Sequence, residues 1–384
     1  MSAKVIIAGD LCLQDRAARM PFADLCSCHN AVKQLTATAD YSIVNLECSV
    51  TNDNSAKPIK KAGKALRNND KVLDLVRFMG FDAVTLANNH FADYGQSAVK
   101  ESLELIESRN LDHVGAGLNL YDSQKILYKT INGVSVAFIN ACEHEFTIAT
   151  PSKGGCNPLN AISLYNNIIE AKQKSDNVVV IIHGGLEEYQ LPTPRMQEMY
   201  RFFVDAGASA VINHHQHCYS GYEIYKGCPI IYGLGNFSFD GNVLGSSTWN
   251  EGYLVRLLIN DTVTFELIPY LQNQDAVGIT LMDGEQVKVF QDKVEELNAV
   301  ISDSGRLEEA MIQISESKRD KYMRPLKPYQ YGPLLKLVKY HIISKKLANK
   351  LLPKYMTPER KLLLKSYFQC ETHQEVMNNL LKDE

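Results

Sequence analysis

The most constraining feature of this sequence is a short apolar segment, residues 209–213, that runs directly into His214-His215-Gln216-His217. Three of the ten histidines fall within these four residues. Imidazole is a common ligand for transition metals, and alternate side chains of an extended backbone share one face. We therefore predict that His215 and His217 reach one metal site together, while His214 points elsewhere. A cluster of hydrogen-bonded histidines on a surface turn is the alternative interpretation.

Four earlier apolar segments, each as long as a β-strand, also end in side chains that bind metals. The side chains that complete them are Asp10 after residues 4–8, Glu47 after 41–46, Asn88-Asn89-His90 after 81–87, and His183 after 178–182. Aspartate next to glycine and paired asparagines are also common in simple turns, which is the alternative at Asp10 and Asn89.

Segments with the periodicity of helices alternate with these strands, at residues 70–79, 96–109 and 194–206. Such alternation argues for an α/β fold in which helices cover the sheets. Ligands in such folds gather beyond the carboxyl ends of the strands, where the polar side chains described above lie.

Together the strand ends offer carboxylate, amide and imidazole ligands for a metal centre: Asp10, Glu47, Asn89, His183, His215 and His217. This set is sufficient for two divalent ions that share a carboxylate. Two ions about 3.5–4 Å apart can lower the pKa of a shared water and bind a substrate oxyanion. Two dications against two carboxylates leave a net positive pocket, which favours an anionic substrate. Cys12 could add a thiolate, although a small buried cysteine is the simpler interpretation.

Composition excludes several classes of protein. The net charge of -4 over 384 residues argues against nucleic acid as a specific partner. The nine cysteines show neither a zinc-ribbon spacing nor a disulfide framework, which favours a reducing compartment and hence the cytoplasm. The first residues begin a strand, and eighteen apolar residues never run together, so we predict neither a signal peptide nor a membrane span.

The character of the sequence changes near residue 276, so we predict a domain over 1–275 and a mainly helical, basic extension over 276–384. Residues 327–365 contain ten lysines and arginines against the single acid Glu359, with leucine and isoleucine between them. Basic amphipathic helices bind anionic membranes or partner proteins, here at the inner face of the membrane. The solvated face of an ordinary helical appendage is an equal alternative.

The chain resembles the CapA family of bacterial capsule or poly-γ-glutamate synthesis proteins, which is related to the calcineurin-like metallophosphoesterases. Seven motifs over about residues 4–270 carry the resemblance: Gly9-Asp10, Asn45-Leu46-Glu47, Ala87-Asn88-Asn89-His90 with Asp93-Tyr94-Gly95, Val114-Gly115-Ala116-Gly117, His183-Gly184-Gly185 with Glu187, His214-His215-Gln216-His217, and Gly235-Asn236-Phe237. The chain departs from the general metallophosphoesterase pattern at two positions. Cys12 replaces a histidine of the first motif, and Glu47 replaces the bridging aspartate.

The resemblance implies a four-layer α/β/β/α sandwich with two divalent ions, which would be manganese, iron or zinc. By motif matching, one ion is held by Asp10, Glu47 and His217, and the other by Glu47, Asn89, His183 and His215. His90 matches the residue that protonates the leaving group, with an orienting role as its alternative. Further side chains of the motifs would support the ligands or contact substrate: Asn88, Asp93, Glu187, His214 and Asn236.

Two functions are compatible with this resemblance. The first is a metal-dependent hydrolase, acting on a phosphoester or amide-type bond during synthesis of capsule or poly-γ-glutamate. The second is a metal-binding scaffold or polymer-binding subunit of a capsule synthesis complex, without catalysis. In both, the partner is an anionic substrate or polymer.

Overall fold

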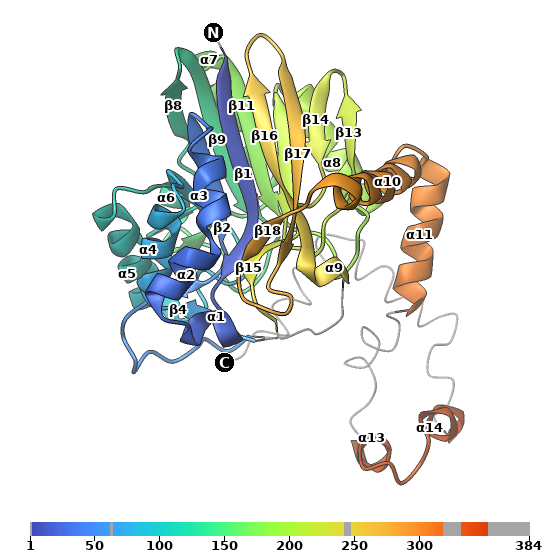
Figure 1. Ribbon diagram of the computed structural model, residues 1–384. Coiled ribbons are helices and arrows are strands. Elements are labelled where there is room, and N and C mark those ends of the chain that lie inside the picture. The colour runs from blue at the N-terminus through green and yellow to red at the C-terminus, as the bar shows by residue number, and fades with distance from the viewer. Residues whose placement is uncertain (1, 62–63, 242–246, 318–331, 352–384) are drawn as a thin grey trace. The chain divides into compact units, whose positions relative to one another are not determined.

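The computed structural model describes residues 2–61, 64–241, 247–317 and 332–351 (Figure 1). Contacts between Cα atoms divide the chain into two compact units, Met1–Met311 and Ile312–Glu384. All of the predicted metal ligands belong to the first unit, which is described first.

An eight-stranded mixed sheet is built around β1 (Ala3–Cys12). The order across the sheet is β18 (Ile279–Leu281), β17 (Val263–Gln272), β16 (Glu251–Ile259), β1, β2 (Tyr41–Leu46), β5 (Ala83–Thr85) and β6 (Asp112–Val114). The eighth strand, β15 (Asn236–Phe239), also pairs with β1. Strands β1, β2, β5 and β6 are parallel, so their carboxyl ends lie at the same edge.

A second, six-stranded sheet faces the first. Its order is β13 (Tyr222–Tyr225), β14 (Cys228–Ile231), β12 (Ala210–His214), β11 (Asn177–His183), β9 (Val134–Cys142) and β8 (Leu127–Ile131). The four inner strands β14, β12, β11 and β9 are parallel to one another, and the outer strands β13 and β8 are antiparallel to their neighbours. Two short pairs lie outside these sheets: β3 (Ser49–Val50) with β4 (Arg67–Asn68), and β7 (Ala116–Gly117) with β10 (Gly155–Cys156).

The two sheets pack together through one face and are covered by helices on the other. Val5 and Ile7 of β1 share an apolar cluster with Phe138 of β9, whereas the intervening Ile6 and Ala8 face the helices. Both faces of β1 are therefore buried, which explains its continuous apolar sequence. Burial of a valine or isoleucine side chain contributes about 1.5–3 kcal/mol, so this alternation fixes the register strongly.

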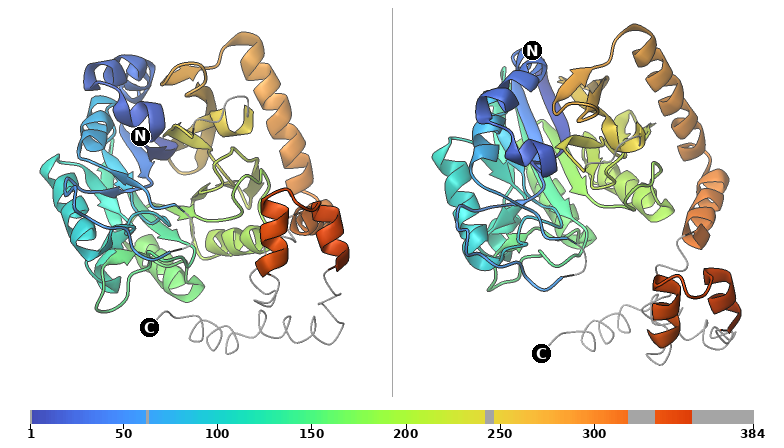
Figure 2. Two further views of the ribbon diagram at one scale, coloured as in Figure 1. Left: turned by 90° about the horizontal axis from the view of Figure 1, so that it is seen from below. Right: turned by 60° about the horizontal axis from the view of Figure 1, so that its bottom comes forward.

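Helices on the outer face of the first sheet are α1 (Asp15–Arg19), α2 (Phe22–Cys28), α3 (Asn30–Thr36), α4 (Lys71–Phe78) and α5 (Gly95–Ser108). The second sheet is covered by α7 (Ala161–Lys174) and α8 (Pro194–Asp205) (Figure 2). Thr193 caps α8 by accepting a hydrogen bond from Met196 N, and Pro194 occupies the first turn, where it removes no helical hydrogen bond. The predicted four-layer α/β/β/α sandwich is thus confirmed. Two one-turn helices, α6 (Leu120–Ser123) and α9 (Ser247–Asn250), lie in connections.

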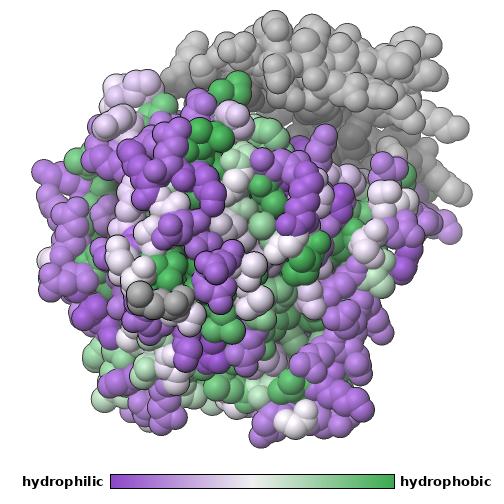
Figure 3. Space-filling view, turned by 90° about the horizontal axis from the view of Figure 1, so that it is seen from above, coloured by the Kyte–Doolittle hydropathy of each residue, from purple (hydrophilic) through white to green (hydrophobic). Residues whose placement is uncertain are grey.

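Two elements beyond residue 275 belong to the core of the first unit. Strand β18 extends the first sheet, and α10 (Gly284–Ile301) places Phe290 and Val294 in the cluster between the sheets. The predicted domain boundary at residue 275 stays a prediction. The compact unit defined by contacts between Cα atoms continues to Met311. Hydrophilic residues dominate the face near the start of β1, and its hydrophobic side chains are scattered, as is typical of a solvated surface (Figure 3).

The rest of the C-terminal part contains helices, as expected. They are α11 (Ser304–Ser317), α13 (Gly332–Lys339) and α14 (Lys345–Leu351). Residues 327–331 and 352–365 of the predicted basic segment lie outside the described residues. In the part of the chain that the structure describes, no helix is both long enough and apolar enough to cross a bilayer.

We expect deletion of residues 327–384 to leave the first unit folded, since the removed residues all lie beyond Met311. The midpoint of thermal unfolding of the truncated chain should match that of the full chain. Insolubility of the truncated chain, or a midpoint lowered by many degrees, would show that the tail is part of the core.

Candidate metal centre

The strand ends bring the predicted ligands together at the carboxyl edges of both sheets. Asp10 lies near the end of β1, and Glu47 and Asn89 follow β2 and β5 of the same sheet. His183 is the last residue of β11 in the second sheet, and His215 and His217 follow β12. Ligands separated widely in sequence are neighbours because the parallel strands of the two sheets end at a common place.

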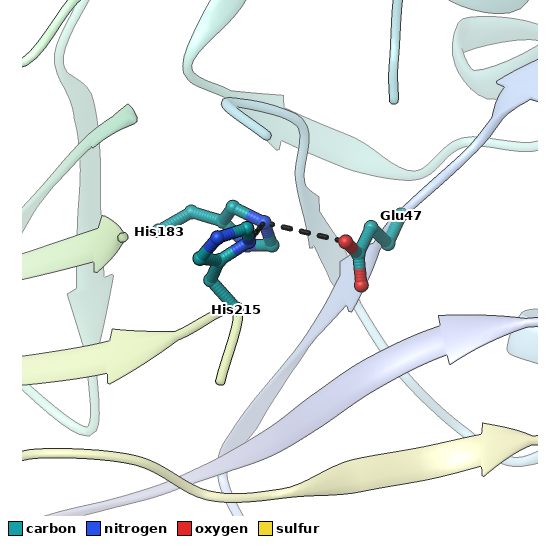
Figure 4. A group of neighbouring side chains, drawn as sticks. All are labelled: Glu47, His183 and His215. Atoms are coloured by element: carbon teal, nitrogen blue, oxygen red, sulfur yellow. Dashed lines mark hydrogen bonds and ion pairs between the residues drawn. The ribbon is translucent and has the colours of Figure 1, made fainter. Parts of the chain in front are cut away.

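The first group of ligands consists of Glu47, His183 and His215 (Figure 4). The two imidazoles lie side by side and face the carboxylate, with 3.3 Å between His183 Nε2 and Glu47 Oε1 and 3.0 Å between His183 Nε2 and His215 Nδ1. Asn89 Oδ1 lies 3.0 Å from His183 Nε2 and therefore adds an amide oxygen to the group.

The second group consists of Asp10, Glu47 and His217. His217 lies between the two carboxylates, with Nδ1 3.8 Å from Asp10 Oδ2 and Nε2 3.9 Å from Glu47 Oε1. Asn236 contacts both the ring and the backbone of His217. Its Oδ1 lies 2.9 Å from Nδ1 of the His217 ring, and its Nδ2 donates to the carbonyl oxygen of His217 at 3.1 Å. Glu47 belongs to both groups.

A close backbone approach positions Asp10. A Cβ atom at Gly9 would lie 2.0 Å from the carbonyl oxygen of Gly235, so only glycine fits there. This approach lets Asp10 N donate a hydrogen bond to Gly235 O at 3.3 Å. The carboxylate of Asp10 accepts hydrogen bonds from Asn45 Nδ2 at 2.6 Å and from the backbone N–H of His215 at 3.1 Å.

The backbone of the histidine motif differs from the extended conformation that we expected. His215 and His217 have φ angles of 96° and 55°, so they do not share a face by simple alternation. They reach the centre because the chain turns sharply after β12. His214 is 2% exposed, with Nδ1 3.4 Å from Asp10 Oδ1, and it lies beside the centre instead of pointing away from it.

The electrostatics of Glu47 fit a cation. Its carboxylate is fully buried, and neither oxygen accepts a hydrogen bond from any residue that the structure describes. Burial raises the pKa of Glu47 well above its ordinary value, and the carboxylates of Asp10 and exposed Glu187 add to the rise. A buried carboxylate without a donor is strongly destabilising unless a cation compensates it.

The imidazoles also suit metal binding, which requires a free electron pair on nitrogen. Burial and then His215 lower the pKa of His183 well below its ordinary value, and burial and then His217 lower the pKa of His215 to about 4. Burial by itself raises the pKa of Asp10, but the neighbouring histidines outweigh it, and the pKa is lowered. The centre therefore offers neutral imidazoles at His183 and His215 and an ionised Asp10.

His90 lies beside the two groups and is 9% exposed. Its Nδ1 is 2.6 Å from Asp93 Oδ2, and its backbone N–H donates to Asn88 Oδ1 at 3.1 Å. Asn88 also donates to the carbonyl oxygen of Leu46 at 2.9 Å, next to Glu47. Burial lowers the pKa of His90, and the hydrogen bond to Asp93 opposes this effect.

Cys12 is buried beside the centre, but neither of the two ligand groups among the described residues includes it. Gln14 Nε2 donates to its sulfur at 3.2 Å. We expect Cys12→Ser to leave the number of bound metal ions unchanged when measured by mass spectrometry of the purified protein. A fall from two ions to one would show that the thiolate is a ligand.

From the sequence, no role in the site was predicted for Asn45, which was named only as part of a motif, or for two aromatic residues. Asn45 donates to Asp10 and lies 3.3 Å from His183 Nδ1, and the available signal was a polar residue inside an apolar strand. Phe239 and Trp249 have ring centroids 5.0 and 5.1 Å from that of His217. Their contact with His217 depends on tertiary structure, so local sequence carried no sign of it.

Comparison with known proteins agrees with the resemblance. The profile of the family described as bacterial capsule synthesis protein PGA_cap matches residues 4–241. Capsule biosynthesis protein CapA of Bacillus anthracis is 33% identical over 241 residues, covering 60% of this chain and 58% of that protein. PGA biosynthesis protein CapA of Bacillus subtilis (strain 168) is 35% identical over 246 residues, covering 62% and 63%.

The chain thus matches less than two thirds of the length of either relative. The solved structure of a hypothetical protein from Thermus thermophilus is 15% identical, with a TM-score of 0.44, and covers 73% of this chain and 100% of that one. The profile match includes each predicted metal ligand and extends over more than half of the 384 residues. The chain therefore belongs to the bacterial capsule synthesis protein family PGA_cap.

Proposed function

We propose that this chain is a metal-dependent hydrolase that acts in the synthesis of a capsule or poly-γ-glutamate polymer. The observation that carries the proposal is Glu47, a buried carboxylate without a hydrogen-bond donor among the described residues, which is shared by two groups of metal-type ligands. The names of the relatives from Bacillus anthracis and Bacillus subtilis support a role in polymer synthesis.

The ligand set suits manganese, iron or zinc, because it mixes imidazole nitrogens with carboxylate and amide oxygens. Two such ions would increase the acidity of water and polarise an oxygen of the substrate. Glu47 would contact both ions, Asp10 and His217 would complete one, and His183, His215 and Asn89 the other. Hydrogen bonds from Asn45 and to Asn236 hold Asp10 and His217 in place before any ion binds.

His90 is the group that we assign to proton transfer. In its protonated form His90 would donate from Nδ1 to Asp93, which stabilises the imidazolium, and would pass the proton on Nε2 to the departing oxygen or nitrogen of the substrate. The substrate would be an anionic phosphoester or an amide-type linkage. Water supplies the other product group, so the reaction needs no redox partner.

A scaffold without catalysis is the second candidate. The burial of the centre favours it, since Asp10, Glu47 and His183 are each no more than 2% exposed and a polymer must reach them to be cleaved. A metal at such a site can also act purely as a structural element.

One experiment separates the two candidates. We expect the purified protein to contain two divalent ions per chain and to hydrolyse a phosphodiester or polyglutamyl model substrate. Removal of the ions by a chelator should abolish turnover, and addition of manganese, iron or zinc should restore it. Two bound ions without turnover of either substrate would favour the scaffold. A chain that takes up none of the three metals would contradict both candidates.

A further inference from the structure

Lys61 is a buried cation beside the proposed metal centre that the proposed function does not yet use. Its side chain is 6% exposed, although it belongs to a loop in which Lys57, Lys60 and Lys64 are exposed. Long charged side chains are rarely buried unless they are paired. The burial of this one lysine among exposed neighbours indicates a specific role.

The partners of Lys61 all belong to the segment that carries His90. Its Nζ lies 2.5 Å from Asp93 Oδ1 and donates to the carbonyl oxygen of Asn89 at 2.8 Å. It also lies 3.3 Å from His90 Nδ1. That nitrogen is closer to Asp93 Oδ2, at 2.6 Å, and one N–H cannot be donor and acceptor at once. We therefore assign the proton on His90 Nδ1 to the hydrogen bond with Asp93.

Both oxygens of Asp93 are occupied in this arrangement. Oδ1 pairs with Lys61, whereas Oδ2 accepts from the backbone N–H of Leu66 at 2.8 Å and from His90. The side chain of Asp93 is 0% exposed, so its charge has no contact with bulk water. Removal of one partner from such a buried pair leaves an uncompensated charge that is strongly destabilising locally.

We propose that Lys61 is a positioning residue for His90. It holds Oδ1 of Asp93 in place, so that Oδ2 accepts the proton of His90 Nδ1 and Nε2 remains directed to the substrate. Lys61 does not contact the reacting atoms and acts only through Asp93. This inference rests on the proposed function for its effect on rate, but not for its effect on the tautomer of His90.

The test compares Lys61→Met, which removes the charge, with Lys60→Met, its exposed neighbour, and with Lys61→Arg, which keeps a charged donor. We expect Lys61→Met to lower kcat on an alkyl phosphodiester about 10–100-fold, with KM and metal content unchanged. Lys60→Met should match the wild type, and Lys61→Arg should recover part of the rate. An independent readout is the nitrogen NMR spectrum of the His90 ring, which should show a strongly hydrogen-bonded Nδ1–H in the wild type and a weaker, less well-ordered one in Lys61→Met.

Several outcomes would overturn the inference. Unchanged kcat and an unchanged His90 spectrum would remove it. A rise in KM alone would make Lys61 a substrate-binding cation, and loss of metal would show that it acts through Asn89. An equal fall in kcat in Lys60→Met would show that the effect of Lys61 comes from general surface charge. If the wild type turns over no substrate, the proposed function fails, and the His90 spectrum alone decides the role of Lys61.

A second pair of variants serves if Lys61→Met does not fold. An amide at position 93 needs no counterion, so Lys61→Met added to Asp93→Asn should cause no further fall in kcat and no further change in the His90 spectrum. A further fall in the double variant would show that Lys61 acts independently of Asp93, contrary to the inference.

Discussion

Glu47→Gln is expected to abolish binding of both metal ions, whereas His217→Ala should remove only one. Glu47 is shared by the two ligand groups, and His217 belongs to one of them. An amide is a far weaker ligand than a carboxylate for both ions. Elemental analysis after dialysis against limiting metal measures the number of ions per chain directly. Glu143→Gln, a carboxylate outside both groups, is the control and should keep two ions.

The same variant should change stability in opposite directions with and without metal. A metal at 100 times its Kd stabilises the folded chain by about 2.7 kcal/mol, a gain that Glu47→Gln should lose. Without metal, the wild type must bury the charge of Glu47 or protonate it at neutral pH, because the pKa of Glu47 is raised in the folded state. Glutamine avoids this cost, so the metal-free variant should unfold at the same or a higher temperature than the metal-free wild type. One ion retained by Glu47→Gln would contradict a shared role.

His90→Ala is expected to lower kcat by about 10²–10⁴ while both metal ions stay bound. The loss should depend on the leaving group. An alkyl phosphodiester needs a proton on its departing oxygen and should lose the full factor. A p-nitrophenyl ester leaves readily without a proton and should lose little.

The control for this variant is His113→Ala, because the half-buried His113 lies on β6, outside the metal centre, and pairs with the exposed Glu107 at 3.5 Å. It should keep the activity of the wild type on both esters. An equal loss on both leaving groups would indicate that His90 orients the substrate instead of protonating it. Loss of metal would indicate that His90 supports its neighbour Asn89.

The central strands could be predicted from sequence because both of their faces are buried. Strands β1, β2, β11 and β12 are continuous apolar segments, and each is followed or ended by a side chain of the metal centre. The turn at Asn132-Gly133 could also be predicted, because an Asn-Gly pair favours the two positive φ angles that a type I′ turn requires. The observed φ angles are 49° and 78°. These features depend on local sequence alone.

Features that depend on distant contacts could not be predicted in this way. The pairing of β1 with β16 joins segments that are far apart in the sequence, such as Ala3 and Ile259, and nothing within either segment specifies its partner. Ile162 and Tyr165 are exposed on α7, which weakens the apolar periodicity of that helix. Lys61 resembled its exposed neighbours in sequence, and only the folded chain shows its pairing with Asp93.

The two ligand groups have a mechanical consequence, because each of them draws on both sheets. Glu47 and Asp10 come from the first sheet, and His183, His215 and His217 come from the second. Each bound ion would therefore act as a cross-link between the two halves of the sandwich, one joining Asp10 to His217 and the other joining Glu47 to His215. Loading with metal should slow amide hydrogen exchange at the carboxyl ends of β1 and β12 together, and the chelated chain should open at this edge before its apolar core does.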